Sequence, residues 1–217
     1  MAARCRRFTL SEGDGPDFPA GAFARIDEGE DAAFYAPPRL VTHIDDAAIA
    51  ALARFYGEII PEGAAVLDLM SSWVSHLPEG LSLAEVIGHG MNSEELAANP
   101  RLNRHFVQDL NRGTTLPLAD ASCDAALCCV SVQYLQKPVD VFGEVRRCLK
   151  PGAPFIVSYS NRCFPTKAVA IWRALDIKGH AGLIRTYLDR SGFSAIEMRL
   201  LVDGSSSDPL IAVIGHG

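Results

Sequence analysis

Side chains of kinds that bind ligands follow directly after an apolar run that ends in Asp68. They include Ser71, Ser72, Trp73 and His76. Serine hydroxyls at the start of a helix bind carboxylates, an indole offers a flat apolar face, and an imidazole can remove a proton near neutral pH. We therefore expect a ligand site directly after this run.

Three further polar segments follow later apolar runs. The first begins at Asp109, the second is residues 130–135 with Tyr134, and the third is residues 159–167 with Asn161 and Arg162. Tyr134 is a second candidate for removing a proton, although a lone tyrosine is more often a packing residue. Arg162 could bind a substrate carboxylate or phosphate, or it could pair with a surface acid.

The apolar runs and the helical patterns between them alternate along the chain. Asp45 or Asp46 can cap the first helix, Ser72 a short second one, and Asn92 or Ser93 a third. This alternation predicts an α/β fold with a doubly wound parallel sheet, and the last two strands should pair antiparallel because no helix separates them. The predicted strands cover residues 64–69, 83–87, 105–108, 125–132, 155–158, 195–201 and 210–214, and the helices cover residues 45–59, 72–77, 93–98, 138–149, 167–175 and 180–190.

Ligands of such sheets bind outside the carboxyl ends of the strands, where the strand order reverses. Here that point lies between the first and fourth predicted strands. The polar segments after Asp68, Gly88, Asp109 and Val130 should therefore line one site.

The order and spacing of these segments resembles the class I S-adenosylmethionine-dependent methyltransferases of type 11. The resemblance rests on Ala64–Met70, Val107-Gln108-Asp109, Leu116–Asp124 and Leu149-Lys150-Pro151-Gly152, and it covers roughly residues 45–215. It implies a Rossmann-like sheet of seven strands in the order 3-2-1-4-5-7-6 with the last strand antiparallel. It also implies methyl transfer from S-adenosyl-L-methionine to a small-molecule acceptor.

The sequence departs from the family at two places. The three turn glycines of the family are Met70, Ser72 and Val74 here, and Gly90 stands where the family has a ribose-binding acid. Side chains in the first loop make a tight glycine turn unfavourable, so this loop must take another path.

The resemblance assigns roles to residues of the polar segments that follow the predicted strands. Asp109 would accept a hydrogen bond from the adenine amino group, and Asn92 could either reach a sugar hydroxyl or only cap the next helix. The residues expected to bind the cofactor are Asp68, Met70, Ser71, Ser72, Gly90, Met91, Asn92, Asp109, Leu110, Val130 and Ser131; those expected to contact the acceptor are Tyr35, Trp73, Gln133, Asn161 and Arg162; and the candidate catalytic residues are His76 and Tyr134.

Two other function classes share this fold type. A pseudo-methyltransferase, used as a binding or regulatory module, would explain the missing glycines and acid. A nicotinamide-dependent oxidoreductase would need phosphate-cradling glycines and an acid after the second strand, and the sequence has neither. We therefore expect a methyltransferase and keep the pseudoenzyme as the alternative.

Composition limits the partners. The chain has 217 residues, 48% of them hydrophobic, and a net charge of −6, which disfavours nucleic-acid binding. No apolar stretch is long enough to span a membrane, and no metal-ligand spacing occurs. We read the six cysteines as reduced thiols of a cytoplasmic protein and expect a flexible arm over residues 1–33 and one domain over residues 34–217. The oligomeric state stays open.

Overall fold

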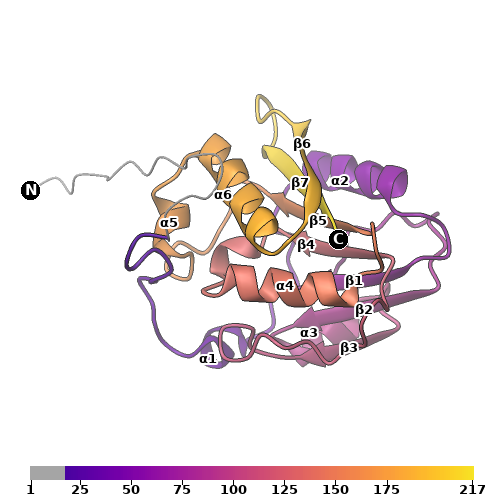
Figure 1. Ribbon diagram of the computed structural model, residues 1–217, viewed down its shortest axis with the longest axis horizontal. Coiled ribbons are helices and arrows are strands. Elements are labelled where there is room, and N and C mark those ends of the chain that lie inside the picture. The colour runs from indigo at the N-terminus through magenta and orange to yellow at the C-terminus, as the bar shows by residue number, and fades with distance from the viewer. Residues whose placement is uncertain (1–17) are drawn as a thin grey trace, which may run out of the picture.

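Seven strands form one sheet in the order β3-β2-β1-β4-β5-β7-β6 (Figure 1). The computed structural model describes residues 18–217. Only β7 runs antiparallel to its neighbours, which confirms the predicted topology. The strands are β1 (Ala65–Leu69), β2 (Glu85–Gly90), β3 (Arg104–Val107), β4 (Ala125–Cys129), β5 (Pro154–Tyr159), β6 (Ser194–Val202) and β7 (Leu210–His216).

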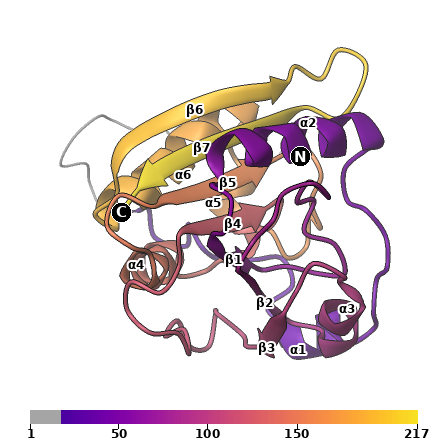
Figure 2. The same cartoon turned by 90° about the vertical axis from the view of Figure 1, so that its right-hand side faces the viewer.

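Helices cover both faces of the sheet (Figure 2). Helix α2 packs its buried residues, among them Leu52 and Tyr56, on one face, and Asp45 caps its first turn. Helices α4 and α6 pack on the other face, through Phe142 and Leu183 among others. The helices are α1 (Asp31–Tyr35), α2 (Asp46–Ile59), α3 (Ser93–Ala98), α4 (Pro138–Cys148), α5 (Ala170–Arg173) and α6 (Ile177–Arg190), with a 3₁₀ turn at Val132–Tyr134.

The predicted helix over residues 72–77 does not form. His76 has a left-handed backbone with φ of 55°, and Pro78 disfavours helical geometry at the residue before it. The side chain of Asn99 donates hydrogen bonds to the Ser72 carbonyl and the Ser75 hydroxyl, both at 2.9 Å, and so holds this stretch as a loop. Ser72 therefore caps no helix, and the site gains no helix N-terminus from it.

Other boundaries differ by a few residues. Strand β2 starts at Glu85 and not at residue 83, and β4 stops at Cys129 and not at residue 132. The early stop of β4 follows from Val130, whose φ of 41° ends the extended strand. Helix α5 covers only four of the residues predicted over 167–175.

The segment before α1 is packed against the domain, whereas we expected a flexible arm to residue 33. Ala22 is buried, and its carbonyl accepts a hydrogen bond of 2.8 Å from the Ile171 amide. The rings of Phe18 and Phe23 meet edge to face at 5.0 Å and join the core. The rest of the expected arm, residues 1–17, lies outside the described residues. Within residues 18–217, no helix is long and apolar enough to cross a membrane.

A buried charge cluster fastens this segment to the chain after β5. The Lys167 ammonium is 1% exposed and lies 2.8 Å from the Gly29 carbonyl and 3.1 Å from the Asp31 carboxylate. Arg25 donates to the same carboxylate at 2.7 Å. Burial would raise the pKa of Asp31, but hydrogen bonds from Arg25, Asn111 and Lys167 hold it below its ordinary value.

We predict that Lys167→Met lowers the free energy of unfolding by about 3–5 kcal/mol, because removing one partner leaves buried carboxylate charge poorly compensated. Urea denaturation followed by fluorescence measures this change. The matched control is Lys150→Met, since Lys150 is 49% exposed and pairs with Asp124, and it should cost at most about 1 kcal/mol. Equal losses in both variants would contradict the structural role of Lys167.

A buried histidine joins the ends of three neighbouring strands. The Met70 amide donates to Nδ1 of His89 at 3.1 Å, and Nε2 of His89 lies 2.9 Å from the Gln108 carbonyl. An amide only donates and a carbonyl only accepts, so His89 must be the neutral tautomer with its proton on Nε2. Burial accordingly lowers the pKa of His89 to about 4.

This lowered pKa predicts a dependence of stability on pH. The unfolded chain binds a proton at His89 below about pH 6.5 and the folded chain only below about pH 4, so stability from this group falls as the pH drops through that window. The expected loss is roughly 3 kcal/mol. The unfolding free energy should fall from pH 7 to pH 4 by about this amount more in the parent than in His89→Gln. Parallel pH profiles would show that His89 titrates normally.

Candidate functional site

A cavity of about 580 Å³ lies at the carboxyl ends of β1 to β5, a volume usual for small-molecule sites. Loops after all five strands line it, together with residues 35–45, which we call the covering segment. Most of the residues that we predicted for binding or catalysis line this cavity. They are Tyr35, Met70, Ser71, Ser72, His76, Gly90, Met91, Asn92, Asp109, Leu110, Val130, Ser131, Tyr134 and Arg162.

Four predicted residues do not line the cavity. Trp73 donates its indole N–H to the Val41 carbonyl at 3.0 Å and so supports the covering segment. Gln133 is 1% exposed and donates to the Val130 carbonyl at 2.8 Å. Asn161 is exposed outside the lining. Trp73 and Gln133 therefore support neighbouring backbone, and Asn161 faces solvent.

Asp68, the fourth, is buried beneath the first loop. It accepts a hydrogen bond of 2.6 Å from the Ser71 hydroxyl. Burial raises the pKa of Asp68 to about 6, and the hydrogen bonds from Ser71 and Ser75 oppose that rise. Asp68 therefore orients Ser71, which itself lines the cavity.

The first loop takes a path that needs no glycine. Met70 adopts the left-handed conformation with φ of 55°, and the hydrogen bond to His89 holds it there. The Ser71 amide bonds the His89 carbonyl at 2.6 Å, which draws the loop onto the end of β2. Strain of this kind costs about 1–3 kcal/mol per residue and is common at functional sites. His76 and Val130 also have the left-handed backbone conformation, and both line the cavity.

Gly90 is required by this loop path. A Cβ at position 90 would lie 2.5 Å from the Ser71 carbonyl oxygen, closer than real Cβ contacts. The position at which the family resemblance suggests a ribose-binding acid therefore has no room for any side chain.

Asn92 caps α3, the second of the two roles considered for it. Its Oδ1 accepts from the amides of Glu94 and Glu95, and its Nδ2 donates to the carbonyls of Tyr35 and Ala36, all at 2.9–3.0 Å. These four bonds use the full capacity of the amide, so Asn92 has no group left for a ligand.

Asp109 keeps a free oxygen at the cavity. Its Oδ1 accepts from the Asn111 amide at 2.9 Å, and within the described chain its Oδ2 has no hydrogen-bond partner. A half-buried carboxylate oxygen in this position can accept a hydrogen bond from a ligand amino group.

The two candidate catalytic residues differ in what they can do. Nδ1 of His76 is buried without a hydrogen-bond partner in residues 18–217, and burial lowers the pKa of the imidazole to about 4. His76 is therefore neutral at physiological pH. The Tyr134 hydroxyl accepts from the Phe164 amide at 2.8 Å, and burial raises its pKa to about 12. Tyr134 keeps its proton at neutral pH, so its hydroxyl has a proton to donate.

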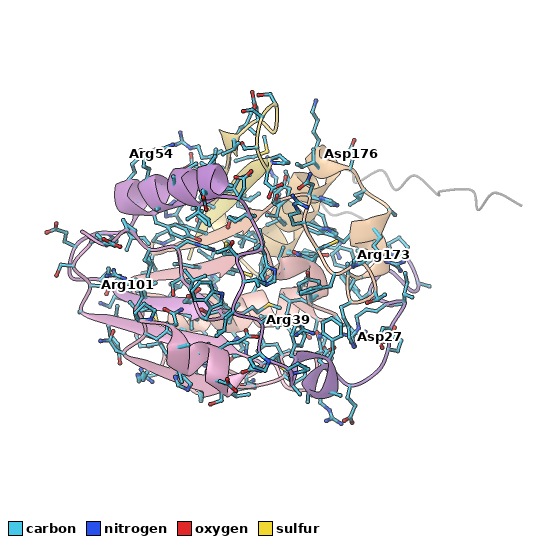
Figure 3. All side chains as sticks on the ribbon, turned by 180° about the vertical axis from the view of Figure 1, so that it is seen from behind. Asp27, Arg39, Arg54, Arg101, Arg173 and Asp176 are labelled. Carbon is cyan, nitrogen blue, oxygen red and sulfur yellow. The ribbon has the colours of Figure 1, made fainter. Side chains whose placement is uncertain are left out.

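Several lining residues were not predicted from the sequence. The covering segment contributes Arg39 and His43, α3 contributes Glu95, and the loop after β5 contributes Phe164. Arg39 lies near the middle of the view in Figure 3, with its guanidinium 4.8 Å from the Phe34 ring and 5.5 Å from the Phe164 ring. Only for Glu95 did the sequence carry a signal, because it follows the cap residue of α3 by three positions and so shares its side of the helix.

Residues 72–157 match a protein family described as "Methyltransferase domain". A malonyl-[acyl-carrier protein] O-methyltransferase of Marinomonas sp. (strain MWYL1) is 34% identical over 79 residues, which are 36% of this chain and 28% of that relative. The chain spans less than a third of the length of the curated relatives it matches.

Solved structures share the fold. A putative methyltransferase in complex with the Trm112 activator from Haloferax volcanii aligns with a TM-score of 0.61 at 16% identity, over 79% of this chain and 90% of that one. An S-adenosylmethionine-dependent methyltransferase from Mesorhizobium loti aligns at 0.55 and 19% identity, over 77% and 98%. With the sheet order, these similarities show that the chain has the fold of the S-adenosylmethionine-dependent methyltransferases, and residues 72–157 match a methyltransferase domain.

Proposed function

We propose that the protein transfers a methyl group from S-adenosylmethionine to a small-molecule acceptor in the cavity at the carboxyl ends of β1 to β5. One observation carries the proposal. The cavity is lined by Asp109, which keeps a free carboxylate oxygen, and by His76, whose imidazole is neutral. The first suits an adenine amino group, and the second suits the proton of an acceptor.

The charge of the lining supports this cofactor. Five carboxylates face the cavity against two guanidinium groups, and the rings of Tyr35, Tyr134 and Phe164 lie among them. Carboxylates and aromatic faces both attract cations, so the lining favours a ligand with a positive sulfur. The carboxylates are Asp31, Asp45, Glu95, Asp109 and Asp208, and the guanidinium groups belong to Arg39 and Arg162.

S-adenosylmethionine, when bound, supplies an already activated methyl group, so little covalent help is needed from the protein. Asp109 would hold the adenine end, and the loop from Met70 to Ser72 would border the middle of the ligand. The covering segment would shield the bound ligand from water, which would strengthen each polar contact in the cavity. The neutral imidazole of His76 would accept the acceptor's proton while Tyr134 donates a hydrogen bond.

An anionic acceptor is the substrate class that we favour. Arg162 pairs with Asp208 through Nε at 2.9 Å, and in the described structure its two terminal nitrogens have no hydrogen-bond partner. A guanidinium with free terminal nitrogens matches a carboxylate or phosphate. The relative from Marinomonas is named for a malonyl group, which ends in a carboxylate.

A binding or regulatory module without methyl transfer is the second candidate. The observation that favours it is the closed contact between Gly90 and the Ser71 carbonyl, which fills space beside β2. A methyl-transfer assay distinguishes the two functions, whereas a binding assay does not, because both allow a nucleoside ligand to bind.

We also propose a cytoplasmic location. All five cysteines of the described chain are free thiols, and three of them, Cys123, Cys128 and Cys148, are buried. Reduced thiols of this kind are usual where the surroundings are reducing.

The cofactor assignment is tested at Asp109. The parent should bind S-adenosylhomocysteine in calorimetry, and Asp109→Ala should weaken binding by about 1–3 kcal/mol, because a buried ligand donor loses its acceptor. The matched control, Asp140→Ala, removes an exposed acid of α4 and should bind like the parent. Absence of binding to the parent at millimolar ligand would exclude the methyltransferase function, and parental affinity in a folded Asp109→Ala would make Asp109 a structural residue.

The acceptor class is tested at Arg162. In an assay of a panel of carboxylates and phosphates with S-adenosylmethionine, Arg162→Met should lower kcat/KM at least about tenfold for the methylated compound and leave S-adenosylhomocysteine affinity unchanged. Arg199→Met is the control, since Arg199 pairs with Glu197 on the remote strand β6. A lower melting temperature with full turnover would instead mark Arg162 as an ion-pair partner of Asp208.

A further inference from the structure

Strand β2 cannot supply a ligand-binding side chain at its end. The Cβ clash with Ser71 excludes every residue but glycine at position 90. Any polar group that serves a ligand at this corner must therefore come from elsewhere, and the next element along the chain is α3.

Glu95 is the acid that α3 turns toward the cavity. It is half-buried and lines the cavity, whereas its neighbour Glu94 is exposed and lies outside the lining. The Glu95 oxygens accept two hydrogen bonds of 2.6 Å, one from the Ser72 hydroxyl and one from the Arg39 amide. Each carboxylate oxygen has a second lone pair, so Glu95 keeps capacity for two more donors.

The same contacts tie Glu95 to the covering segment. Three side chains of residues 72–95 hold the backbone of this segment: Asn92 at Tyr35 and Ala36, Glu95 at Arg39, and Trp73 at Val41. Asn92 has no capacity left for a ligand, and Trp73 does not line the cavity. Among these three side chains, only Glu95 can contact the covering segment and a ligand at once.

The other carboxylates of the lining are already paired or lie after strands other than β2. Asp31 is occupied by Arg25, Lys167 and Asn111. Asp45 and Asp208 each accept a hydrogen bond from the other's backbone amide, and Asp208 also pairs with Arg162, which follows β5. Asp109 lies after β3, the edge strand of the sheet. A pair of adjacent hydroxyls, as on a ribose, is recognised by a carboxylate that accepts from both.

We propose that Glu95 binds the sugar hydroxyls of a nucleoside ligand and that its bond to the Arg39 amide couples this binding to closure of the covering segment. The inference rests on the proposed function in one respect, namely that the nucleoside belongs to S-adenosylmethionine. A ligand hydroxyl on Glu95 fixes the carboxylate, and a fixed carboxylate holds the covering segment more firmly. Binding and closure thereby reinforce each other.

A cycle of ligand and protein variants tests the sugar contact. Calorimetry compares S-adenosylhomocysteine with its 2′-deoxy and 3′-deoxy analogues on the parent, Glu95→Gln and the matched control Glu94→Gln. We expect the parent and Glu94→Gln to prefer the intact sugar by about tenfold or more, and Glu95→Gln to reduce this preference to about twofold or less. Melting curves verify that each variant is folded, and the analogues test the parent without any substitution.

Limited trypsin digestion tests the coupling. The bond after Arg39 lies in the covering segment, next to Leu40, which is 54% exposed. S-adenosylhomocysteine should slow cleavage at this bond about fivefold or more in the parent and in Glu94→Gln, because cleavage follows the population of the open form. In Glu95→Gln, with ligand at saturation, this protection should fall below about twofold.

The outcomes separate the two proposals. If the parent binds S-adenosylhomocysteine but does not distinguish the deoxy analogues, or if Glu95→Gln keeps the parental preference, the sugar contact is refuted and the methyltransferase function stands. If Glu95→Gln loses the preference and keeps full protection at Arg39, the coupling is refuted. If the parent binds none of the three ligands, the proposed function fails and the inference fails with it.

Discussion

The contact between Gly90 and the Ser71 carbonyl is the constraint on which the binding site depends. It exists because the loop after β1 is drawn onto the end of β2 by two hydrogen bonds to His89, one to its side chain and one to its carbonyl. The neutral imidazole, held by the Gln108 carbonyl, extends this arrangement to β3. One buried histidine thus replaces the glycine turn as the device that positions the first loop.

The loop path has consequences for the covering segment. Trp73, Asn92 and Glu95 present hydrogen-bonding groups to residues 35–45, and these groups hold a stretch that has little buried apolar surface of its own. On its other side the chain is fastened by the buried cluster of Arg25, Asp31 and Lys167. Polar contacts therefore hold the chain that borders the cavity both at residues 25–31 and at residues 35–41.

This construction also determines what the cavity can do. Its carboxylates outnumber its guanidinium groups, but most of the carboxylate oxygens are already bonded to the protein. The groups with capacity left for a ligand include an oxygen of Asp109, the terminal nitrogens of Arg162 and the remaining lone pairs of Glu95. Chemistry that needs alignment and exclusion of water more than acid–base strength suits such a site, since burial keeps His76 neutral and Tyr134 protonated.

The sequence by itself determined the sheet and the place of the site, because unbroken apolar runs such as β4 and the order of strands and helices are local patterns with few compatible topologies. It also placed Asp109, His76 and Arg162 at strand ends. Only the tertiary structure decided the path of the loop at Met70, the contact that makes Gly90 obligatory, and the packing of residues 35–45 over the cavity. Those features arise from contacts between segments distant along the chain, such as Trp73 with Val41 and Lys167 with Asp31, and no local pattern encodes them.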